Sequence, residues 1–477
     1  MIQPASKASG PALTSTAADL PALDVLPGTL PGALPELQPD LHLLGAAPQY
    51  AAPNGLRGVW QRWCQQQVIN AFAAMGKGSL LLTLPDGSQR QFGQANDPYQ
   101  ACLTVLDAAF FERILLYGHV GFGEAYVDGL CDSPDIEQFL KWVLLNVQQA
   151  AFLQGARNAS WRFNLLGALN RLAHRLKDNS VRNSKKNIRA HYDLSNDFFE
   201  LMLDSTMMYS SGLYDLPVEP GYDACASSSP TDEAALTRAQ IKKIDRLCQR
   251  LRLSPQDHVL EIGSGWGGFA CYAAKNYGCR VTSITISEAQ FVYAQAKAAA
   301  EGLTHRVTFK LQDYRQTEGT FDKIVSIEMV EALGERYFDV FFARCTALLK
   351  PKGTMGLQMI ICPDARYDVL KSNVDFIQKH IFPGSLLPSL GRVNQALARC
   401  GTLQLFDLKD FGPSYAVTLR AWQSRFNQNA ENIKQLGFDT AFMRKWRYYL
   451  SYCAAAFQMR HISVVQAIYT RPDNDLL

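Results

Sequence analysis

In the second half of the chain, short runs of apolar residues alternate with longer segments in which apolar residues recur every three or four positions. The short runs predict strands and the longer segments predict helices. The predicted strands are residues 259–262, 281–284, 307–311, 324–327 and 354–360, and the predicted helices are residues 269–277, 288–301 and 337–349. This alternation is typical of a doubly wound, mostly parallel α/β sheet, in which ligands bind beyond the carboxyl ends of the strands.

A different pattern precedes this α/β part. Residues 79–84 and a return strand through Phe92 flank a turn at residues 85–88, which predicts a hairpin. Residues 103–117 have helical spacing, and glycines at positions 118, 121 and 123 follow them. We therefore expect a small α+β domain over residues 53–150, a linker over residues 151–186 and the α/β domain over residues 187–477.

The N-terminal segment differs again, because 8 of the 22 prolines lie in the first 50 residues. Proline removes a backbone donor and blocks helix growth. We predict that residues 1–52 form a disordered tail rich in proline and alanine.

Charge is nearly balanced over the whole chain, with 47 Lys and Arg against 44 Asp and Glu. The net charge of +3 argues against a protein whose whole surface binds nucleic acid. Between residues 157 and 190, however, nine basic residues accompany one acidic residue, which gives a local charge of +8. Leu165, Leu169, Leu172 and Leu176 have helical spacing there, so this basic linker is either an interfacial amphipathic helix or a packed helix with a solvated charged face.

Cysteine usage and hydropathy indicate the compartment. The 11 cysteines form no C-x-x-C pair and fit neither a disulfide framework nor a zinc site. The chain lacks an apolar run of the about 18 residues that a membrane span requires, and its N-terminus lacks the pattern of a secretory signal. We expect a cytoplasmic protein without a metal site.

A glycine-rich loop at residues 263–268 follows the first predicted α/β strand. The loop fits the G-x-G-x-x-G pattern of dinucleotide sites and also the E-x-G-x-G-x-G pattern of S-adenosylmethionine sites, the latter through Glu261, Gly263, Gly265 and Gly267. A dinucleotide site needs an acidic residue about 20 positions later. This chain offers the hydroxyls of residues 285–287 instead, which favours S-adenosylmethionine over NAD.

Several further segments form an ordered series with the glycine-rich loop, at residues 191–198, 208–211, 239–243, 261–268, 285–290, 312–315, 328–331, 375–389 and 415–422. Together they resemble the cyclopropane-fatty-acyl-phospholipid synthase family of S-adenosylmethionine-dependent methyltransferases. The similarity covers nearly everything after the proline-rich tail. It implies a Rossmann-like methyltransferase domain, and it implies that the small N-terminal domain, with its segment at residues 121–126, helps to engage phospholipid.

The resemblance also implies two sets of site residues. The residues expected to bind S-adenosylmethionine are Tyr209, Ser210, Glu261, Gly263, Gly265, Gly267, Thr285, Ser287, Gln290, Gln312 and Asp313. The residues expected to form a catalytic cluster that holds a bicarbonate ion are Ser211, Glu331, Gln358, Ile360 and Tyr415. Methyl transfer to an alkene creates a carbocation, and the bound anion would remove a proton so that the ring closes.

Three positions depart from the family pattern, while Glu331 and Tyr415 retain it. Ser211 stands where many members have Cys, and Gln358 and Ala332 stand where they have His. Neutral Gln358 removes a charge that could help to hold bicarbonate. The fold is unaffected by these changes, whereas the identity of the product becomes open.

We therefore predict an enzyme that transfers a methylene unit from S-adenosylmethionine to the double bond of an unsaturated phospholipid acyl chain, forming a cyclopropane. The expected location is the cytoplasm, with peripheral association to the anionic inner face of the membrane. One alternative is a lipid C-methyltransferase that gives methyl- or methylene-branched chains, and another is a non-catalytic lipid-binding protein, against which Glu331 and Tyr415 argue. An RNA methyltransferase is disfavoured because its catalytic motifs are missing, so no nucleic-acid partner is expected. A homodimer is left open.

Overall fold

The computed structural model describes residues 56–94, 97–147, 194–216 and 232–475, which lie within one unit of the chain, Gln49–Leu477. The predicted tail, the basic linker and residues 191–193 of the first family segment fall outside the described residues. The predicted domain boundaries therefore stay predictions.

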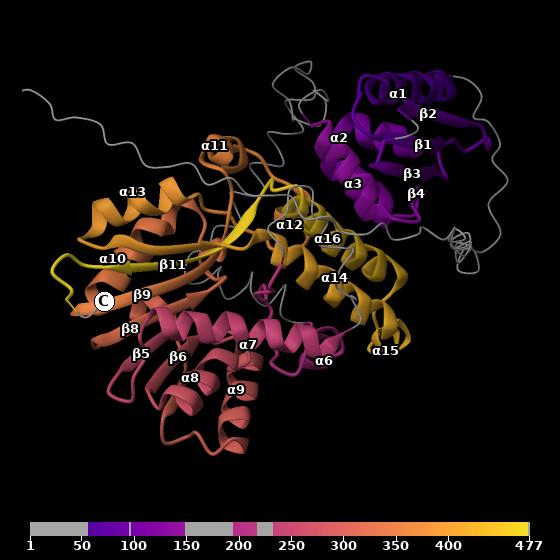
Figure 1. The fold of residues 1–477 in the computed structure, drawn as a ribbon. Coiled ribbons are helices and arrows are strands. Elements are labelled where there is room, and N and C mark those ends of the chain that lie inside the picture. Colours follow the sequence, from indigo (N-terminus) through magenta and orange to yellow (C-terminus); the bar gives the residue numbers. More distant parts are fainter. Residues whose placement is uncertain (1–55, 95–96, 148–193, 217–231, 476–477) are drawn as a thin grey trace, which may run out of the picture. The chain divides into compact units, whose positions relative to one another are not determined.

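A seven-stranded sheet forms the centre of the α/β part, with strand order β10-β11-β9-β8-β5-β6-β7 (Figure 1). Strands β9, β8, β5, β6 and β7 run parallel, whereas β11 is antiparallel to both of its neighbours. The strands are β5 (His258–Ile262), β6 (Arg280–Thr285), β7 (Val307–Leu311), β8 (Phe321–Ile327), β9 (Leu349–Ile361), β10 (Gln404–Asp410) and β11 (Ser463–Thr470). The predicted doubly wound, mostly parallel sheet is confirmed.

Helices cover both faces of this sheet because side chains alternate along each strand. On β5, Val259 packs into one apolar core, whereas Leu260 and Ile262 pack into the other. The first core includes residues of α7 (Glu233–Arg250), α8 (Gly268–Tyr277) and α9 (Glu288–Ala300). The second includes residues of α10 (Phe338–Leu348), α11 (Asp364–Ser372) and α13 (Leu390–Cys400).

Shorter elements and a helical group complete the α/β part. The 3₁₀ turns are η2 (Tyr314–Gln316), η3 (Val330–Ala332) and η4 (Glu335–Tyr337), and the remaining helices are α6 (Asn196–Met202), α12 (Phe376–His380), α14 (Gly412–Gln428), α15 (Ala430–Gln435) and α16 (Thr440–Gln458). Helices α14 and α16 pack against each other and share a core with the N-terminal elements. No helix among the described residues combines the length and the apolar character that crossing a bilayer demands.

The N-terminal elements form a four-stranded sheet with order β2-β1-β3-β4. The elements are α1 (Leu56–Ala73), β1 (Ser79–Thr83), β2 (Gln89–Gly93), β3 (Gln100–Val105), α2 (Ala109–Val127), β4 (Cys131–Asp132) and α3 (Ile136–Leu145). Strands β1 and β2 form the predicted hairpin. The helix predicted at residues 103–117 is wrong at its start, because Ala101, Leu103 and Val105 alternate into the core as part of β3.

Helix α2 continues through the glycines at which the predicted helix stopped. Gly118 has φ 59° and kinks the helix, a conformation that glycine adopts readily. A Cβ on Gly123 would lie 2.5 Å from the Phe376 ring of α12 and 2.8 Å from the Tyr448 ring of α16. Glycine at position 123 therefore allows α2 to pack closely against these two helices.

Polar contacts join the same elements. Glu137 of α3 accepts two hydrogen bonds from Arg420 Nε of α14, at 3.0 and 3.2 Å, and both side chains are buried. Glu124 of α2 accepts hydrogen bonds from Lys379 (2.6 Å) and His380 (2.9 Å) of α12. These two donors hold the pKa of Glu124 at about 2, although its partial burial acts in the opposite direction.

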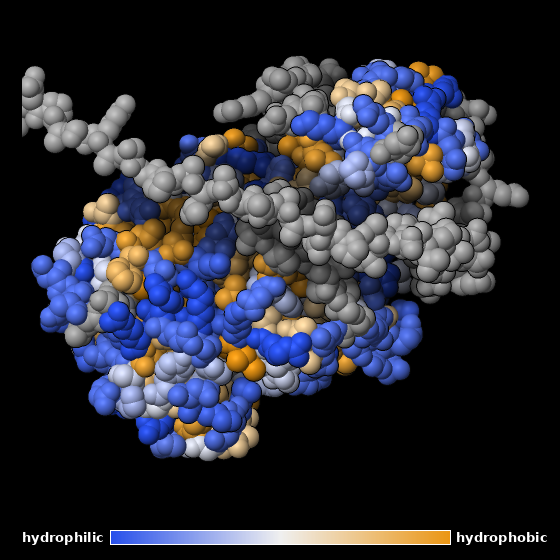
Figure 2. Space-filling model, in the orientation of Figure 1, coloured by the Kyte–Doolittle hydropathy of each residue, from blue (hydrophilic) through white to orange (hydrophobic). Residues whose placement is uncertain are grey.

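Strand β10 lies at the edge of the large sheet. Leu405, Phe406 and Leu408 are exposed on it, and the pairing with β11 shifts register between Leu405 and Asp407. Asp407 accepts hydrogen bonds from Arg246 and Arg250 of α7, each at 2.9 Å. In the view of Figure 2, hydrophilic residues cover most of the described surface, and hydrophobic residues form smaller, separate patches.

Candidate active site

The glycine-rich loop connects the carboxyl end of β5 to the N-terminus of α8. Gly263, Gly265 and Gly267 all have positive φ, at 98°, 49° and 87°. A Cβ on Gly265 would meet no atom within 4 Å, whereas a Cβ on Gly267 would lie 3.1 Å from both Ala294 and Phe309. The loop thus faces open space at Gly265, beside a helix N-terminus that attracts polar ligand groups.

Glu261 belongs to β5, directly before the loop. Its side chain is buried and accepts a hydrogen bond from Ser283 of β6. Burial raises the pKa of Glu261 to about 8, so the carboxyl is protonated at neutral pH. Its contact with a cofactor stays a prediction.

The structure brings together four predicted residues at the ends of β6 and β7. Ser287 caps α9 by accepting a hydrogen bond from the Gln290 N–H, and the Thr285 hydroxyl accepts one from the Ser287 N–H (3.1 Å). The same hydroxyl donates to Gln290 Oε1 (3.1 Å), and the Gln312 N–H donates to the Thr285 carbonyl (2.8 Å). These hydroxyls therefore order the strand end and the start of α9, whatever else they bind.

Asp313 follows Gln312 and forms an ion pair with Arg315 (2.7 Å). On another segment, after α6, the Tyr209 hydroxyl is 2.9 Å from the Tyr449 hydroxyl of α16. Ser210 accepts a hydrogen bond from Lys243 Nζ (2.7 Å). Each of these predicted residues already has a protein partner.

Lys243 is a fully buried cation that the sequence analysis placed in a family segment without giving it a role. Burial lowers the pKa of Lys243 to about 8, and the nearby carboxylates of Glu328 and Asp204 oppose this shift. A buried ammonium beside a carboxylate stabilises the ionised form of that carboxylate.

Glu328 is the centre of the predicted catalytic cluster, although it was not among the predicted site residues. Its Oε1 accepts hydrogen bonds from the Ser211 N–H (2.9 Å) and from Gln358 Nε2 (2.8 Å). Its Oε2 accepts a hydrogen bond from the Tyr415 hydroxyl (2.6 Å). Three of the five predicted cluster residues thus bind one protein carboxylate.

The position of Glu328 in the sequence could have marked it as a candidate site residue. It is the first residue after β8, at the carboxyl end of a parallel strand, where α/β folds place functional groups. Its φ of 49° lies in the left-handed region, which costs a residue with a side chain about 1–3 kcal/mol. The chain tolerates this strain in order to direct a carboxylate into the cluster.

Glu331 lies one turn further on, in η3, and is buried. Its Oε1 accepts a hydrogen bond from the Ile360 N–H of β9, and its Oε2 has no hydrogen-bond partner among the described residues. Burial and the neighbouring charge of Glu328 raise the pKa of Glu331 to about 8. Glu331 is therefore a neutral acid at pH 7.

The two acids have unlike environments. Burial raises the pKa of Glu328, but Tyr415, Lys243, Gln358 and Ser211 all favour its ionised form. For Glu331, two main-chain N–H groups, its own and that of Ile360, favour the ionised form, but burial and the charge of Glu328 outweigh them. Glu328 thus has more groups that favour its ionised form than Glu331 has, and unlike environments of this kind can separate the pKa values of two carboxyls.

The cluster adjoins the glycine loop. A Cβ on Gly263 would lie 3.3 Å from Met329 Cγ, and Met329 follows Glu328 directly. An anion beside a ligand-binding loop can stabilise a developing cation and accept a proton from it.

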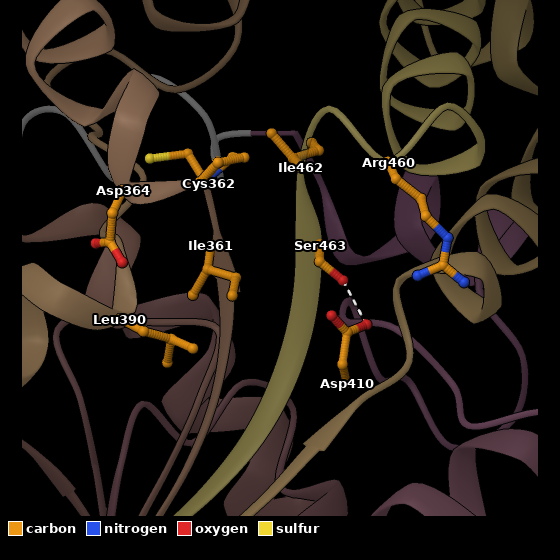
Figure 3. A pocket seen from close by; sticks show the side chains of 9 residues that line it. Ile361, Cys362, Asp364, Leu390, Asp410, Arg460, Ile462 and Ser463 are labelled. Carbon is orange, nitrogen blue, oxygen red and sulfur yellow. Dashed lines mark hydrogen bonds between the residues drawn. The ribbon is translucent and has the colours of Figure 1, made fainter.

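A cavity of about 220 Å³ opens nearby, beside the ends of β9 and β11 (Figure 3). Ile361, Asp364, Asp410 and Ser463 line it, and the Ser463 hydroxyl donates to Asp410 (2.6 Å). It contains none of the predicted site residues, so we base the site on the carboxylate cluster instead.

The family model described as mycolic acid cyclopropane synthetase matches residues 179–467 of this chain. The chain belongs to this family. It is 36% identical over 358 residues to the tuberculostearic acid methyltransferase UfaA1 of Mycobacterium tuberculosis, covering 75% of this chain and 80% of that protein. It is 35% identical over 390 residues to the cyclopropane-fatty-acyl-phospholipid synthase of Escherichia coli, covering 79% of this chain and 89% of that protein.

Among solved structures, the mycolic acid cyclopropane synthase CmaA1, in complex with SAH and CTAB, matches with a TM-score of 0.52 and 29% identity. The match covers 60% of this chain and 98% of that one. The predicted family is thereby confirmed, and the chain is an S-adenosylmethionine-dependent methyltransferase of the cyclopropane synthase type. The roles of individual site residues stay predictions.

Proposed function

We propose that this enzyme transfers a methyl group from S-adenosylmethionine to the double bond of an unsaturated phospholipid acyl chain and closes a cyclopropane ring. The observation that carries the proposal is the pair of unlike carboxyls, Glu328 and Glu331, beside the glycine loop of a family member. An isolated alkene is a weak nucleophile, so catalysis depends on positioning the two reactants and on stabilising the cation that forms.

The Glu328 carboxylate would stabilise the cation, since its negative charge is fixed by Tyr415, Gln358 and the Ser211 N–H. The Ser211 hydroxyl donates to the Gly212 carbonyl instead. The donor to Glu328 is thus a main-chain group that Ser and Cys share, so the departure at position 211 matters less than the one at position 358.

A second candidate is C-methylation that leaves a methyl or methylene branch. It is favoured by the similarity to a tuberculostearic acid methyltransferase and to a probable fatty acid methyltransferase of Pseudomonas putida, neither of which is named for a ring-forming reaction. The two candidates share the methyl transfer. Ring closure removes a proton from the transferred methyl while the cation is on the neighbouring carbon, whereas a methylene branch requires a hydride to move to that carbon before the methyl loses its proton, and a saturated methyl branch further requires a separate hydride donor.

The proposed substrate requires contact with a phospholipid surface. On α1, Val59, Trp60 and Trp63 are 57%, 41% and 46% exposed, and exposed Arg57 and Arg62 lie among them. Tryptophan suits the boundary between headgroups and acyl chains, and arginine is attracted to anionic lipid. These residues support peripheral binding to an anionic membrane, to which the basic linker would add.

The bicarbonate implied by the family resemblance is not part of this proposal. Its predicted donors Ser211, Gln358 and Tyr415 are bonded to Glu328, and the Ile360 N–H is bonded to Glu331. Four of the five residues predicted to hold bicarbonate therefore direct these donors to protein carboxyls, and Glu331 is the one member of the set whose carboxyl proton is not already committed among the described residues. This donor set fits an additional anion poorly.

The test is to incubate the purified enzyme with S-adenosylmethionine and vesicles of unsaturated phospholipid, and to examine the extracted acyl chains by proton NMR. Ring protons resonate unusually far upfield, whereas a methylene branch gives alkene signals, so the method separates isomers that mass cannot. Vesicles of saturated phospholipid are the control and should stay unchanged. Unmodified unsaturated chains would contradict the proposal.

A further inference from the structure

We infer that the Glu328 carboxylate is a built-in general base that takes the place of a dissolved anion in this enzyme. The inference rests on the proposed methyl transfer to a lipid double bond and adds the identity of the group that removes the proton. It assigns to a protein side chain the role that the family resemblance implies for bicarbonate.

The hydrogen-bond donors of Tyr415, Ser211 and Gln358 support this inference. The Tyr415 hydroxyl and the Ser211 N–H each have one hydrogen, and both point to Glu328. Gln358 Nε2 has two hydrogens, which go to Glu328 Oε1 (2.8 Å) and to the Ser211 carbonyl (3.2 Å). The remaining Gln358 oxygen accepts a hydrogen bond from Gln466 (3.0 Å). No donor of these three residues is left for a second anion.

Glu328 also has room to act as a base. A carboxylate has about four acceptor positions, and the three donors among the described residues leave one position on Oε2. Glu328 is partly buried as a whole residue, while burial of its carboxyl is the largest cause that raises its pKa. Lys243 lies close enough to favour the negative charge, and Glu331 holds a proton instead of competing for the same donors.

The proposed reaction consists of a methyl transfer followed by a proton transfer to Glu328. Bound S-adenosylmethionine supplies a methyl group on a sulfonium. The π pair of the alkene bonds to that methyl carbon, the S–C pair stays on sulfur, and the positive charge moves to the acyl chain. Glu328 Oε2 then takes a proton from the transferred methyl carbon, and the C–H pair closes the ring. The proton stays on Glu328 until the product leaves and solvent reaches the carboxyl.

The backbone conformation at Glu328 suggests a substitution that removes the carboxylate without straining the fold. Its φ of 49° suits glycine better than glutamate, so Glu328→Gly relieves strain while it removes the carboxylate. The variant leaves the Tyr415 hydroxyl, Gln358 Nε2 and the Ser211 N–H without their acceptor, around a space of carboxylate size. A small anion such as bicarbonate or formate should fit there.

The first experiment measures turnover on unsaturated phospholipid vesicles in buffer freed of carbon dioxide. We expect wild-type turnover to be independent of added bicarbonate, and Glu328→Gly to lose about 100-fold or more, as removal of a general base does. Bicarbonate or formate should restore part of the activity of Glu328→Gly. Glu328→Gln should stay inactive, because its amide fills the space. A wild-type enzyme that needs bicarbonate, or a Glu328→Gly variant with full turnover in its absence, would overturn the inference.

The second experiment does not depend on catalysis. Carbon-13 NMR of labelled bicarbonate, recorded with S-adenosylhomocysteine present, should detect binding to Glu328→Gly and none to the wild type or Glu328→Gln. Bicarbonate binding to the wild type, or the absence of binding to a Glu328→Gly variant whose thermal unfolding shows a folded protein, would refute the inference. If wild-type enzyme modifies no unsaturated lipid, the proposed function fails, while this binding comparison still decides the role of Glu328.

Discussion

Removal of the Tyr415 hydroxyl tests the polar cluster directly. Tyr415→Phe deletes the 2.6 Å hydrogen bond to Glu328 Oε2 and keeps the ring, which stacks on Phe457 at 4.3 Å. A hydrogen bond to a charged group contributes about 1.5–3 kcal/mol. If that contribution is fully expressed in the transition state, turnover should fall by about 10- to 150-fold.

The assay is the rate of S-adenosylhomocysteine release, combined with calorimetric titration of the same ligand. Affinity for S-adenosylhomocysteine should not change, because Tyr415 contacts the carboxylate rather than the glycine loop. Loss of this donor also raises the pKa of Glu328, since the hydroxyl favours the ionised form. The rising limb of the pH–rate profile should therefore move to higher pH.

Tyr469→Phe is the matched control. The Tyr469 hydroxyl is buried in β11 and has no hydrogen-bond partner among the described residues, so its removal should leave turnover unchanged. A Tyr415→Phe enzyme within twofold of the wild type, with an unchanged pH profile, would refute the assignment of Tyr415 and Glu328 to the chemical step.

Three further predictions concern the loop, the second acid and the membrane surface. Gly265→Val should abolish S-adenosylhomocysteine binding in calorimetry, because it fills open space at φ 49°, whereas Gly87→Val in the hairpin turn, at φ 82°, should leave binding intact. Glu331 has a pKa of about 8 in the folded protein against 4.5 in the unfolded chain, so its contribution to the free energy of unfolding is complete below pH 4.5 and is lost as the pH rises to about 8. Denaturation of Glu331→Gln should therefore show a smaller decrease in the free energy of unfolding between these pH values than the wild type does. An equal decrease would contradict the raised pKa. Replacement of Trp60 and Trp63 by Ala should weaken sedimentation with anionic vesicles without changing thermal stability, and unchanged sedimentation would exclude α1 as a membrane contact.

Strands β5, β6, β8 and β9 could be predicted because each contains a run of residues buried on both faces between turn residues. Strand β7 was predicted although it is buried on one face only. Strands β10 and β11 were not predicted, and β10 is exposed along most of its length. The secondary structure of residues 100–105 was harder to predict from the sequence. Ala101, Leu103 and Val105 alternate as in a strand, but Leu103 also continues the apolar spacing of the following helix. Pairing with β1, which is set by tertiary structure, decides between the two.

The site was predictable only in part, for a similar reason. The family resemblance pointed to Ser211, Gln358 and Tyr415, but these residues come from a loop, from β9 and from α14. Spacing along the chain cannot show that all three bind Glu328 rather than Glu331, three residues away. Which of the two carboxyls accepts these hydrogen bonds depends on the left-handed backbone conformation at Glu328, which no local sequence pattern predicts.

The edge strand β10 affects how the protein behaves at high concentration. An edge strand with Leu405, Phe406 and Leu408 exposed offers apolar side chains to another chain, along with backbone groups that pair with no other strand in the described part of the chain. The register shift before Asp407 interrupts the regular spacing that a new strand would need. A strand added there would also have to cover a carboxylate held by two arginines of α7. The edge is thus protected against extension of the sheet, even though three apolar residues remain exposed on it.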